Sequence, residues 1–277
     1  MKVLALETRR AAEIAKLIRA NGGEPTVVSA MREVPLESNQ EALAFAERLL
    51  HGEFDLVIFT TGVGARRLME IVESRYDRAE IVDALRRVKL AARGPKAAAA
   101  IRELGLPIAV TAAEPCTWHE VMASLEAAFG PALAGMRAAV QEYGMPNPDL
   151  LNGLADRGVE AVRVPVYHWA LPEDLEPLRD AVRGIAAGKF EAVVFLTAVQ
   201  VVHLFEVAEE MSAASALRAG LGRAVVLSIG PSTSEELLRH GIQPDLEPSH
   251  PKMGFLMNEA AARAAALLEE KRRALNG

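Results

Sequence analysis

The stretch FDLVIFTT at residues 54–61 is repeated as FEAVVFLT at residues 190–197, 136 positions further along the chain. Both are short apolar runs that end in threonine, as expected of a buried strand that leads into a loop. The pair Gly94-Pro95 recurs at the same spacing as Gly230-Pro231. A period of this length exceeds that of solenoid repeats and indicates a duplicated domain. The sequence therefore predicts two similar lobes with a cleft between them.

Strand-like and helix-like segments alternate in both copies. In the first copy we expect strands at 2–6, 56–59, 90–92 and 108–110, and helices at 10–21, 39–50, 63–73 and 95–104. In the second copy we expect strands at 138–140, 193–195 and 225–229, and helices at 148–155, 199–211, 232–239 and 254–273. This alternation is typical of α/β domains with parallel sheets, in which ligands bind beyond the carboxyl ends of the strands.

Two further stretches, 26–34 and 161–169, look extended and carry no helix pattern of their own. They occupy equivalent places in the two copies, and Pro35 and Pro165 interrupt them. Both are candidates for the linker between the lobes.

The composition excludes several classes of protein. The 277 residues carry a formal net charge of −6, which argues against a nucleic-acid partner but allows local positive charge around a small anion. No stretch approaches the roughly 20 apolar residues of a membrane span. The single cysteine, Cys116, cannot form an intrachain disulfide, and the N-terminus does not read as a signal peptide. We expect a cytoplasmic protein without a membrane partner.

Glycine-containing loops between strands and helices are the main functional signal. They occur at 61–64, 94–95 and 230–231. Glycine allows a close backbone approach, and a helix start offers free amides to an anion. Paired loops on two lobes therefore suggest a ligand with several acidic groups, although each Gly-Pro turn could merely join a strand to a helix. Basic residues that could assist, or could simply be solvated, are Arg9, Arg10, Arg66, Arg67, Arg93 and Lys96.

Motifs for metal, nucleophile or cofactor chemistry are missing from the sequence. The six histidines show no metal-ligand spacing, and Cys116 near His119 has no evident third partner. We therefore expect no metal and no cofactor. If the protein is an enzyme, its reaction must depend mainly on the reactivity of the substrate itself. The hydroxyl of Tyr167 could donate a proton to a leaving group. Alternatively, Tyr167 could be a structural residue whose ring packs in the core and whose hydroxyl contacts solvent.

The order and spacing of several short pieces resemble the uroporphyrinogen-III synthase family over essentially the whole chain. The pieces are Thr8-Arg9, FTTGV at 59–63, Val166-Tyr167, FLTAV at 195–199, and SIGPST at 228–233 followed by Leu237 and Gly241.

The resemblance implies two parallel-sheet α/β domains joined by a two-stranded antiparallel linker. It places the first strand and helix with the C-terminal lobe. One domain would comprise residues 1–33 plus 168–277 and the other residues 36–164, with linkers at about 34–35 and 165–167. The repeat alone fits a simple tandem equally well.

The resemblance also implies a reaction. Hydroxymethylbilane, a linear tetrapyrrole with eight carboxylates, would lose water and close to uroporphyrinogen III with ring D inverted. No cofactor is implied. Spontaneous closure gives the uninverted isomer, so the protein must mainly hold a conformation. The implied partners are this small molecule, possibly handed over by hydroxymethylbilane synthase, and we expect a monomer.

Matching the family motifs position by position gives the expected site. Tyr167 matches a tyrosine that assists loss of the hydroxyl, and is the expected catalytic residue. The expected substrate-binding residues are Arg9, Thr61, Gly62, Val63, Arg93, Gly94, Tyr143, Gly144, Thr197, Ala198, Gly230, Ser232 and Thr233. The sequence departs from the family pattern at Ala97, which stands opposite Thr233 in the first copy, and at Arg10 and Glu142.

Two other classes remain open at this point. A non-catalytic two-lobed binding protein would close on a small ligand, but usually carries an export signal or a DNA-binding head. A two-lobed glycosyltransferase would need room for a nucleotide and usually has a longer chain.

Overall fold

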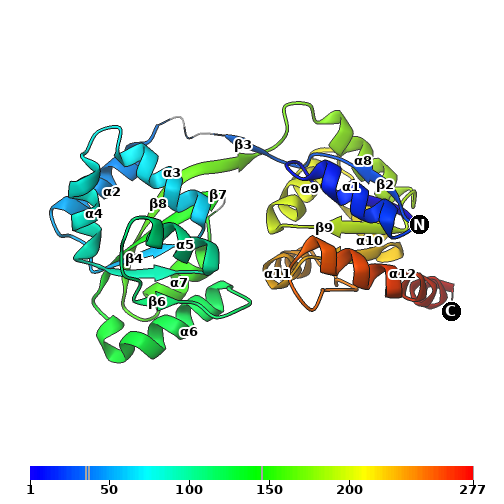
Figure 1. Ribbon diagram of the computed structural model, residues 1–277. Helices are drawn as coiled ribbons and strands as arrows, with labels where there is room; N and C mark the ends of the chain where they lie inside the picture. The colour runs from blue at the N-terminus through cyan, green and yellow to red at the C-terminus, as the bar shows by residue number, and fades with distance from the viewer. Residues whose placement is uncertain (35, 37, 145, 277) are drawn as a thin grey trace. The chain divides into compact units, whose positions relative to one another are not determined.

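The computed structural model describes residues 1–34, 36, 38–144 and 146–276, without the side chains of Tyr143, Leu275 and Asn276. The chain forms two compact units (Figure 1). Unit 1 comprises Met1–Arg32 and Ala170–Gly277, and unit 2 comprises Glu33–Trp169. Each unit has a sheet with helices beside it, which confirms the predicted pair of α/β domains.

The sheet of unit 1 has four strands in the order β10-β9-β1-β2, and every neighbouring pair is parallel. Its strands are β1 (Lys2–Ala5), β2 (Glu24–Val27), β9 (Ala192–Phe195) and β10 (Val225–Ser228). Its helices are α1 (Ala11–Ala20), α8 (Glu176–Ala186), α9 (Ala198–Glu210), α10 (Ala214–Arg223), α11 (Pro231–Arg239) and α12 (Met253–Asn276).

Alternate residues of these strands enter two different cores. Val193 and Phe195 of β9 pack with the apolar faces of α8, α9 and α10. Ala192 and Val194 pack on the opposite face with α1 and α12. All four residues of β9 are buried, because a parallel sheet covered on both faces has no polar side.

The sheet of unit 2 has the order β3-β8-β7-β4-β5-β6, in which β4 to β8 run parallel. Its strands are β3 (Arg32–Val34), β4 (Leu56–Phe59), β5 (Lys89–Ala92), β6 (Val110–Thr111), β7 (Arg137–Gly144) and β8 (Glu160–Ala170). Its helices are α2 (Gln40–Leu50), α3 (Gly62–Val72), α4 (Arg78–Arg86), α5 (Pro95–Glu103), α6 (Trp118–Phe129) and α7 (Pro148–Ala155), with a short 3-10 turn η1 (Gly130–Leu133).

The duplication is visible element by element. The helix starts of α3, α4 and α5 precede those of α9, α10 and α11 by 136 residues each. The two copies nevertheless exchange their first segments. Strands β1 and β2 join β9 and β10 from the second half, whereas β7 and β8 join β4 and β5 from the first half. The chain therefore crosses between the units at β3 and again at the end of β8.

The stretches predicted as extended linkers are more regular than expected. Residues 26–34 hold the end of β2 and, after a break, β3. Residues 161–169 belong to β8, which pairs with β7 along most of its length. In the sheet of unit 2, the edge strand β3 is the neighbour of β8. The two segments in which the chain passes from one unit to the other are therefore adjacent strands.

Helices α4, α6, α8 and α10 are additions to the predicted set. The α8 pattern was readable, because Leu178, Ala181, Val182 and Ile185 recur at helical spacing and are buried. Among the described residues, no helix combines the length and the apolar character needed to cross a lipid bilayer.

Candidate functional site

Helices begin at the carboxyl edge of each sheet, where the loops of the predicted site lie. In unit 1 this edge carries the starts of α1, α9 and α11, which follow β1, β9 and β10. In unit 2 it carries the starts of α3, α5 and α7, which follow β4, β5 and β7. Because the strands of each sheet run parallel, these starts collect positive helix ends on one side of each unit.

The loop after β4 is fixed by two threonines. The hydroxyl of Thr60 donates to the carbonyl of Gln141 on β7 at 2.8 Å, in a buried position. The hydroxyl of Thr61 accepts from the Gly64 amide at 3.0 Å and so caps α3. The predicted contact residue Thr61 therefore already uses its side chain within the fold. Val63, the next predicted residue, is half exposed.

Two glycines in the first turn of α3 allow neighbouring residues to lie very close to its backbone. A Cβ atom at Gly62 would lie 2.3 Å from the carbonyl oxygen of Lys96, in the first turn of α5. A Cβ atom at Gly64 would lie 2.1 Å from Nε2 of Gln141. The starts of α3 and α5 are therefore in backbone contact, and only glycine fits at position 62.

The loop after β5 brings Arg93 and Gly94 against the loop after β6. A Cβ atom at Gly94 would lie 3.0 Å from Sγ of Cys116. Burial lowers the pKa of the Arg93 guanidinium, and the charge of Cys116 acts in the opposite direction. Burial, helped by Glu114, raises the pKa of the Cys116 thiol, which therefore stays protonated at neutral pH. A protonated thiol is a poor nucleophile, so Cys116 acts here as a packing group.

The end of β7 holds the predicted residues Tyr143 and Gly144. The side chain of Tyr143 lies outside the described part of the structure. Gly144 has φ +88°, and a Cβ atom there would lie 2.0 Å from the ring of Trp169. Glycine is thus required at position 144 by backbone conformation and by packing.

Tyr167 is a core residue of unit 2. Its side chain is 3% exposed, its hydroxyl oxygen is buried, and its ring meets Trp169 edge-on at 5.6 Å. Around it is a cavity of about 310 Å³ whose other lining residues are Glu33, Val63, Arg66, Arg67 and Glu70. Arg66 forms a two-pronged ion pair with Glu103, and Arg67 pairs with Glu70. The two arginines are therefore already neutralised.

In unit 1 the loop after β9 mirrors the loop after β4. The hydroxyl of Thr197 accepts from the Val199 amide at 3.1 Å and caps α9. Oε1 of the fully buried Gln200 accepts from the Leu196 amide at 2.7 Å, and its Nε2 lies 3.4 Å from Glu7. Ala198 stands where unit 2 has Gly62.

The loop after β10 holds Gly230, Ser232 and Thr233 at the start of α11. Thr233 is 3% exposed, and Ser232 is exposed. The hydroxyl of Ser234 lies within hydrogen-bond distance of Oγ of Ser228 and of the Glu247 carboxylate, which ties the loop after β10 to the segment before α12. Arg9 is exposed in the turn before α1.

The helix starts differ in how their free amides are used. Glu7 accepts from the Arg10 amide at 2.9 Å, and Glu142 accepts from the Asn147 amide at 3.4 Å, so α1 and α7 have acidic partners of their own. Threonines cap α3 and α9. Among these six helices, α1, α5 and α11 have no side-chain cap on a first-turn amide, and of these only α5 and α11 begin with a Gly-Pro pair. Uncapped amides of this kind bind anions.

Three buried polar residues at this edge were missed from the sequence: Glu7, Gln141 and Gln200. The side chains of the two glutamines fill equivalent positions in the two units, although the residues belong to different elements. Gln141 lies on β7 beside Gly64, whereas Gln200 lies on α9, at the position equivalent to Gly64. Oε1 of Gln141 is buried without a hydrogen-bond donor among the described residues. The signal available in the sequence was a pair of glutamates, Glu7 and Glu142, at equivalent strand ends.

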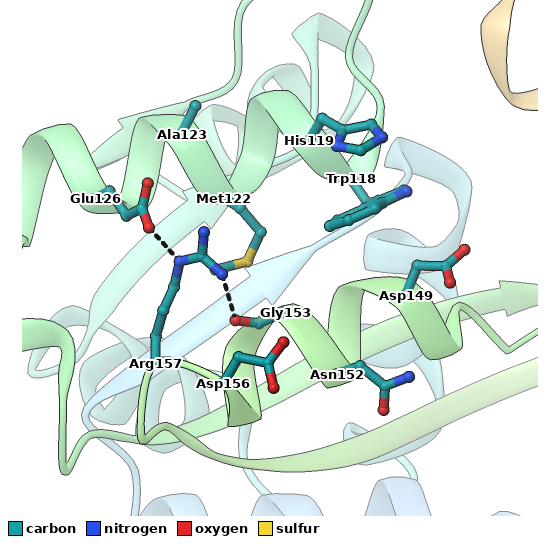
Figure 2. A pocket seen from close by; sticks show the side chains of 10 residues that line it. All are labelled: Trp118, His119, Met122, Ala123, Glu126, Asp149, Asn152, Gly153, Asp156 and Arg157. Carbon is teal, nitrogen blue, oxygen red and sulfur yellow. Dashed lines mark hydrogen bonds and ion pairs between the residues drawn. The ribbon is translucent and has the colours of Figure 1, made fainter.

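A separate cavity of about 320 Å³ lies between α6 and α7 (Figure 2). Figure 2 shows Arg157 reaching from the end of α7 toward Glu126 on α6, and it also donates to the Gly153 carbonyl at 2.9 Å. The ring of His119 stacks on Trp118 at 3.8 Å between centroids. None of the predicted site residues lines this cavity, and no cluster of His, Cys, Asp or Glu in the described ranges is arranged for a metal ion.

Comparison with known families gives a match over most of the chain. A family model described as Uroporphyrinogen-III synthase HemD matches residues 12–258. The protein "Uncharacterized protein YjjA" of Bacillus subtilis is 30% identical over 258 residues, which cover 92% of each chain.

Solved structures agree with this match. The chain is similar to a mutant uroporphyrinogen III synthase of the extremely thermophilic bacterium Thermus thermophilus, with a TM-score of 0.76, 30% identity, and coverage of 96% of this chain and 99% of that one. The wild-type synthase of the same organism, in a second crystal form, gives a TM-score of 0.60 at 29% identity, covering 96% and 98%.

The contact between the starts of α3 and α5 gives a first prediction. Gly62→Ala should destabilise the protein by about 1–3 kcal/mol, because the added methyl forces two backbones apart. Gly222→Ala is the matched control: a Cβ there meets nothing within 4 Å, so alanine in α10 should be neutral or stabilise by up to about 1 kcal/mol. Urea denaturation measures both. Equal stability of the two variants would show that α3 and α5 are not in contact.

Proposed function

The chain belongs to the uroporphyrinogen-III synthase family, and on that premise we propose how its own residues act on hydroxymethylbilane. The protein is an enzyme of this type, which closes the linear tetrapyrrole to uroporphyrinogen III. The observation that carries the assignment is the extent of the match, because residues 12–258 include the carboxyl-edge loops of both units. The matches do not favour a non-catalytic binding protein.

The first step of the proposal is recognition of carboxylates. The substrate is a polycarboxylate, and the uncapped starts of α5 and α11 offer amide donors in a field that favours negative charge. Arg93 adds a guanidinium beside α5, and Ser232 and Thr233 add hydroxyls at α11. The other residues proposed to contact substrate at the carboxyl edges are Gly62, Val63, Gly94 and Gly144 in unit 2, and Arg9, Thr197, Ala198 and Gly230 in unit 1.

The second step is control of the ring closure. In the proposed lyase chemistry, water leaves the hydroxymethyl carbon of ring A, and ring D closes in inverted orientation. Free substrate closes without inversion, so the enzyme must favour one geometry more than it must supply a strong acid. Holding reacting groups in a productive arrangement can supply several kcal/mol of the barrier.

Tyr167 is our candidate for assisting the departure of the hydroxyl. Its support is its place on the wall of the cavity that also includes Val63, in the first turn of α3. Because the hydroxyl oxygen is buried, this role requires the surrounding side chains to move when substrate binds. A tyrosine with a pKa near 10 can donate a hydrogen bond to a leaving hydroxyl at neutral pH.

We also propose a cytoplasmic location and a monomeric enzyme that takes its substrate from hydroxymethylbilane synthase. These proposals follow from the unstable substrate and the biosynthetic role of the family.

The activity is tested by supplying hydroxymethylbilane and separating the products. The account predicts the type III isomer in excess of the type I isomer that forms spontaneously. A reaction that yields only type I, with folded protein present, would refute the assignment.

The role of Tyr167 is tested with Tyr167→Phe, which removes the hydroxyl and keeps the ring in the core. Turnover should fall at least about tenfold with a small change in KM, since the lost interaction acts in the transition state. Leu238→Ala, an exposed position on α11, is a control that should leave turnover unchanged. Unchanged kinetics of Tyr167→Phe would remove Tyr167 from the mechanism and leave positioning as the main effect.

A further inference from the structure

The cavity between α6 and α7 is separate from the proposed substrate site. Its two helices pack on the face of the unit 2 sheet that carries Leu56 and Ile58, whereas Tyr167 belongs to the core on the opposite face, with Val57 and Phe59. Several side chains that line the cavity are exposed, so it opens to solvent. Its volume of about 320 Å³ is large enough for a small molecule.

The lining comes from one row of side chains on each helix, at the three- and four-residue spacing of a helix face. The rows are Trp118, Met122 and Glu126 on α6, and Asp149, Asn152 and Asp156 on α7 and at its C-cap. Both helices begin at the carboxyl edge of the sheet and run in the same direction. The cavity is therefore a groove between two packed helices of one unit.

The floor of the groove is the place where the two helices touch. Gly153 of α7 is buried, and a Cβ atom there would lie 3.3 Å from Cγ of Met122 and 3.4 Å from Cζ3 of Trp118. The ring of His119 stacks on the indole of Trp118. The half-buried indole is thus held by the backbone of α7 and by a second ring, and it forms an aromatic wall of the groove.

One end of the groove already binds a guanidinium group. Nε of Arg157 pairs with the Glu126 carboxylate, and Nη1 donates to the Gly153 carbonyl at 2.9 Å. Figure 2 shows this pair at one end of the groove, and Trp118 and Asp149 toward the other. The chain's own side chains therefore show that a planar cation fits between α6 and α7.

The wall on α7 carries negative charge that the groove does not neutralise. Asp149 and Asp156 lie two turns apart, and Arg157, which Glu126 already pairs, alone carries a fixed positive charge among the described lining residues. No donor among the described residues contacts the Asp156 carboxylate. Asp156 is also the C-cap residue of α7, where the helix dipole disfavours negative charge. A cation in the groove would offset both effects.

We propose that this groove binds a small organic cation of the guanidinium class, beside Trp118 and along the row formed by Asp149, Asn152 and Asp156. A guanidinium pairs with carboxylates through two N–H groups and stacks on aromatic rings, whereas an ammonium group is compact and strongly hydrated. The sheet of unit 2 lies between this site and the Tyr167 cavity, so the proposal does not depend on the proposed function.

The test is a titration of the isotope-labelled full chain with ethylguanidinium, followed by the indole N–H signals. The chain has two tryptophans, Trp118 and Trp169, and Trp169→Phe assigns their signals. The Trp118 signal should shift in a saturable way with a Kd of about 1–10 mM, as expected for so small a ligand. The Trp169 signal, from a ring packed on Tyr167, should not move.

Two analogues of the probe test the ligand class. Ethylammonium, which lacks the planar group, should bind at least about threefold more weakly than ethylguanidinium. N-ethylurea has the same shape without the charge and should not bind at these concentrations. Added KCl should weaken the binding of ethylguanidinium, because the attraction is electrostatic.

Three variants test the residues. Asp156→Asn should raise the Kd for ethylguanidinium at least about threefold, because it removes a charge-assisted contact. Arg157→Met removes a like charge and frees Glu126, so it should lower the Kd. Glu80→Gln, at an exposed position of α4 outside the groove, removes the same charge from the protein and should leave the Kd unchanged.

Stability separates a ligand contact from a structural role. Asp156→Asn should unfold at the same or a higher urea concentration than the wild type, because a carboxylate at a helix C-terminus does not stabilise the helix. A marked loss of stability in this variant would show that Asp156 serves the fold and would overturn its role in binding.

The remaining outcomes decide the site itself. A Trp118 signal that does not shift, that never saturates, or that moves together with the Trp169 signal would overturn the proposal. Equal binding of N-ethylurea or ethylammonium would overturn the ligand class. An unchanged Kd in Asp156→Asn, or a higher Kd in Arg157→Met, would contradict the assigned contacts. None of these results would affect the proposed function, which the isomer assay tests separately.

Discussion

Burial of both faces of each parallel sheet is the constraint on which the rest of the structure depends. The strands β4 and β9 are buried along their whole length, so helices must cover two faces. Each helix returns the chain to the amino edge and each strand carries it forward again. The carboxyl edges consequently collect helix starts, with their unpaired amides and partial positive charge. We propose that these helix starts, which follow from the parallel fold itself, bind the carboxylates of the substrate.

The helix starts at the two carboxyl edges differ in how their amides are used, and the proposed site rests on this difference. Glu7 and Glu142 place an internal carboxylate at α1 and α7. Threonines occupy one amide each at α3 and α9. The Gly-Pro starts of α5 and α11 remain open, since proline at the first position has no amide hydrogen and glycine offers no capping group. The two open starts lie 136 residues apart, at equivalent places in the repeat, and differ in their neighbours: Arg93 and Lys96 at α5, Ile229 and Ser232 at α11.

The sequence predicted correctly those features that depend on a few neighbouring residues. Apolar runs ending in threonine located β4 and β9, and the Gly-Pro pairs located the starts of α5 and α11, within a residue. The exchange of first segments between the units was not decided by the repeat, because each half contains strands that could pair within it or across it. Helix α10 was missed since its Gly-rich sequence has a weak helical preference that packing on α8 overrides. The close approach of Gly94 to Cys116 depends on the path of the loop after β6, which no spacing in the sequence predicts.

Amide chemical shifts provide the most direct measurement of the central claim that open helix starts bind the substrate's carboxylates. Isotope-labelled protein would be titrated with uroporphyrin III, the stable oxidised form of the product. The account predicts that the amides of Lys96 and Ala97 shift and become protected from exchange, whereas those of Arg10 and Asn147, which already have glutamate partners, do not. Binding that leaves Lys96 and Ala97 unchanged would contradict it.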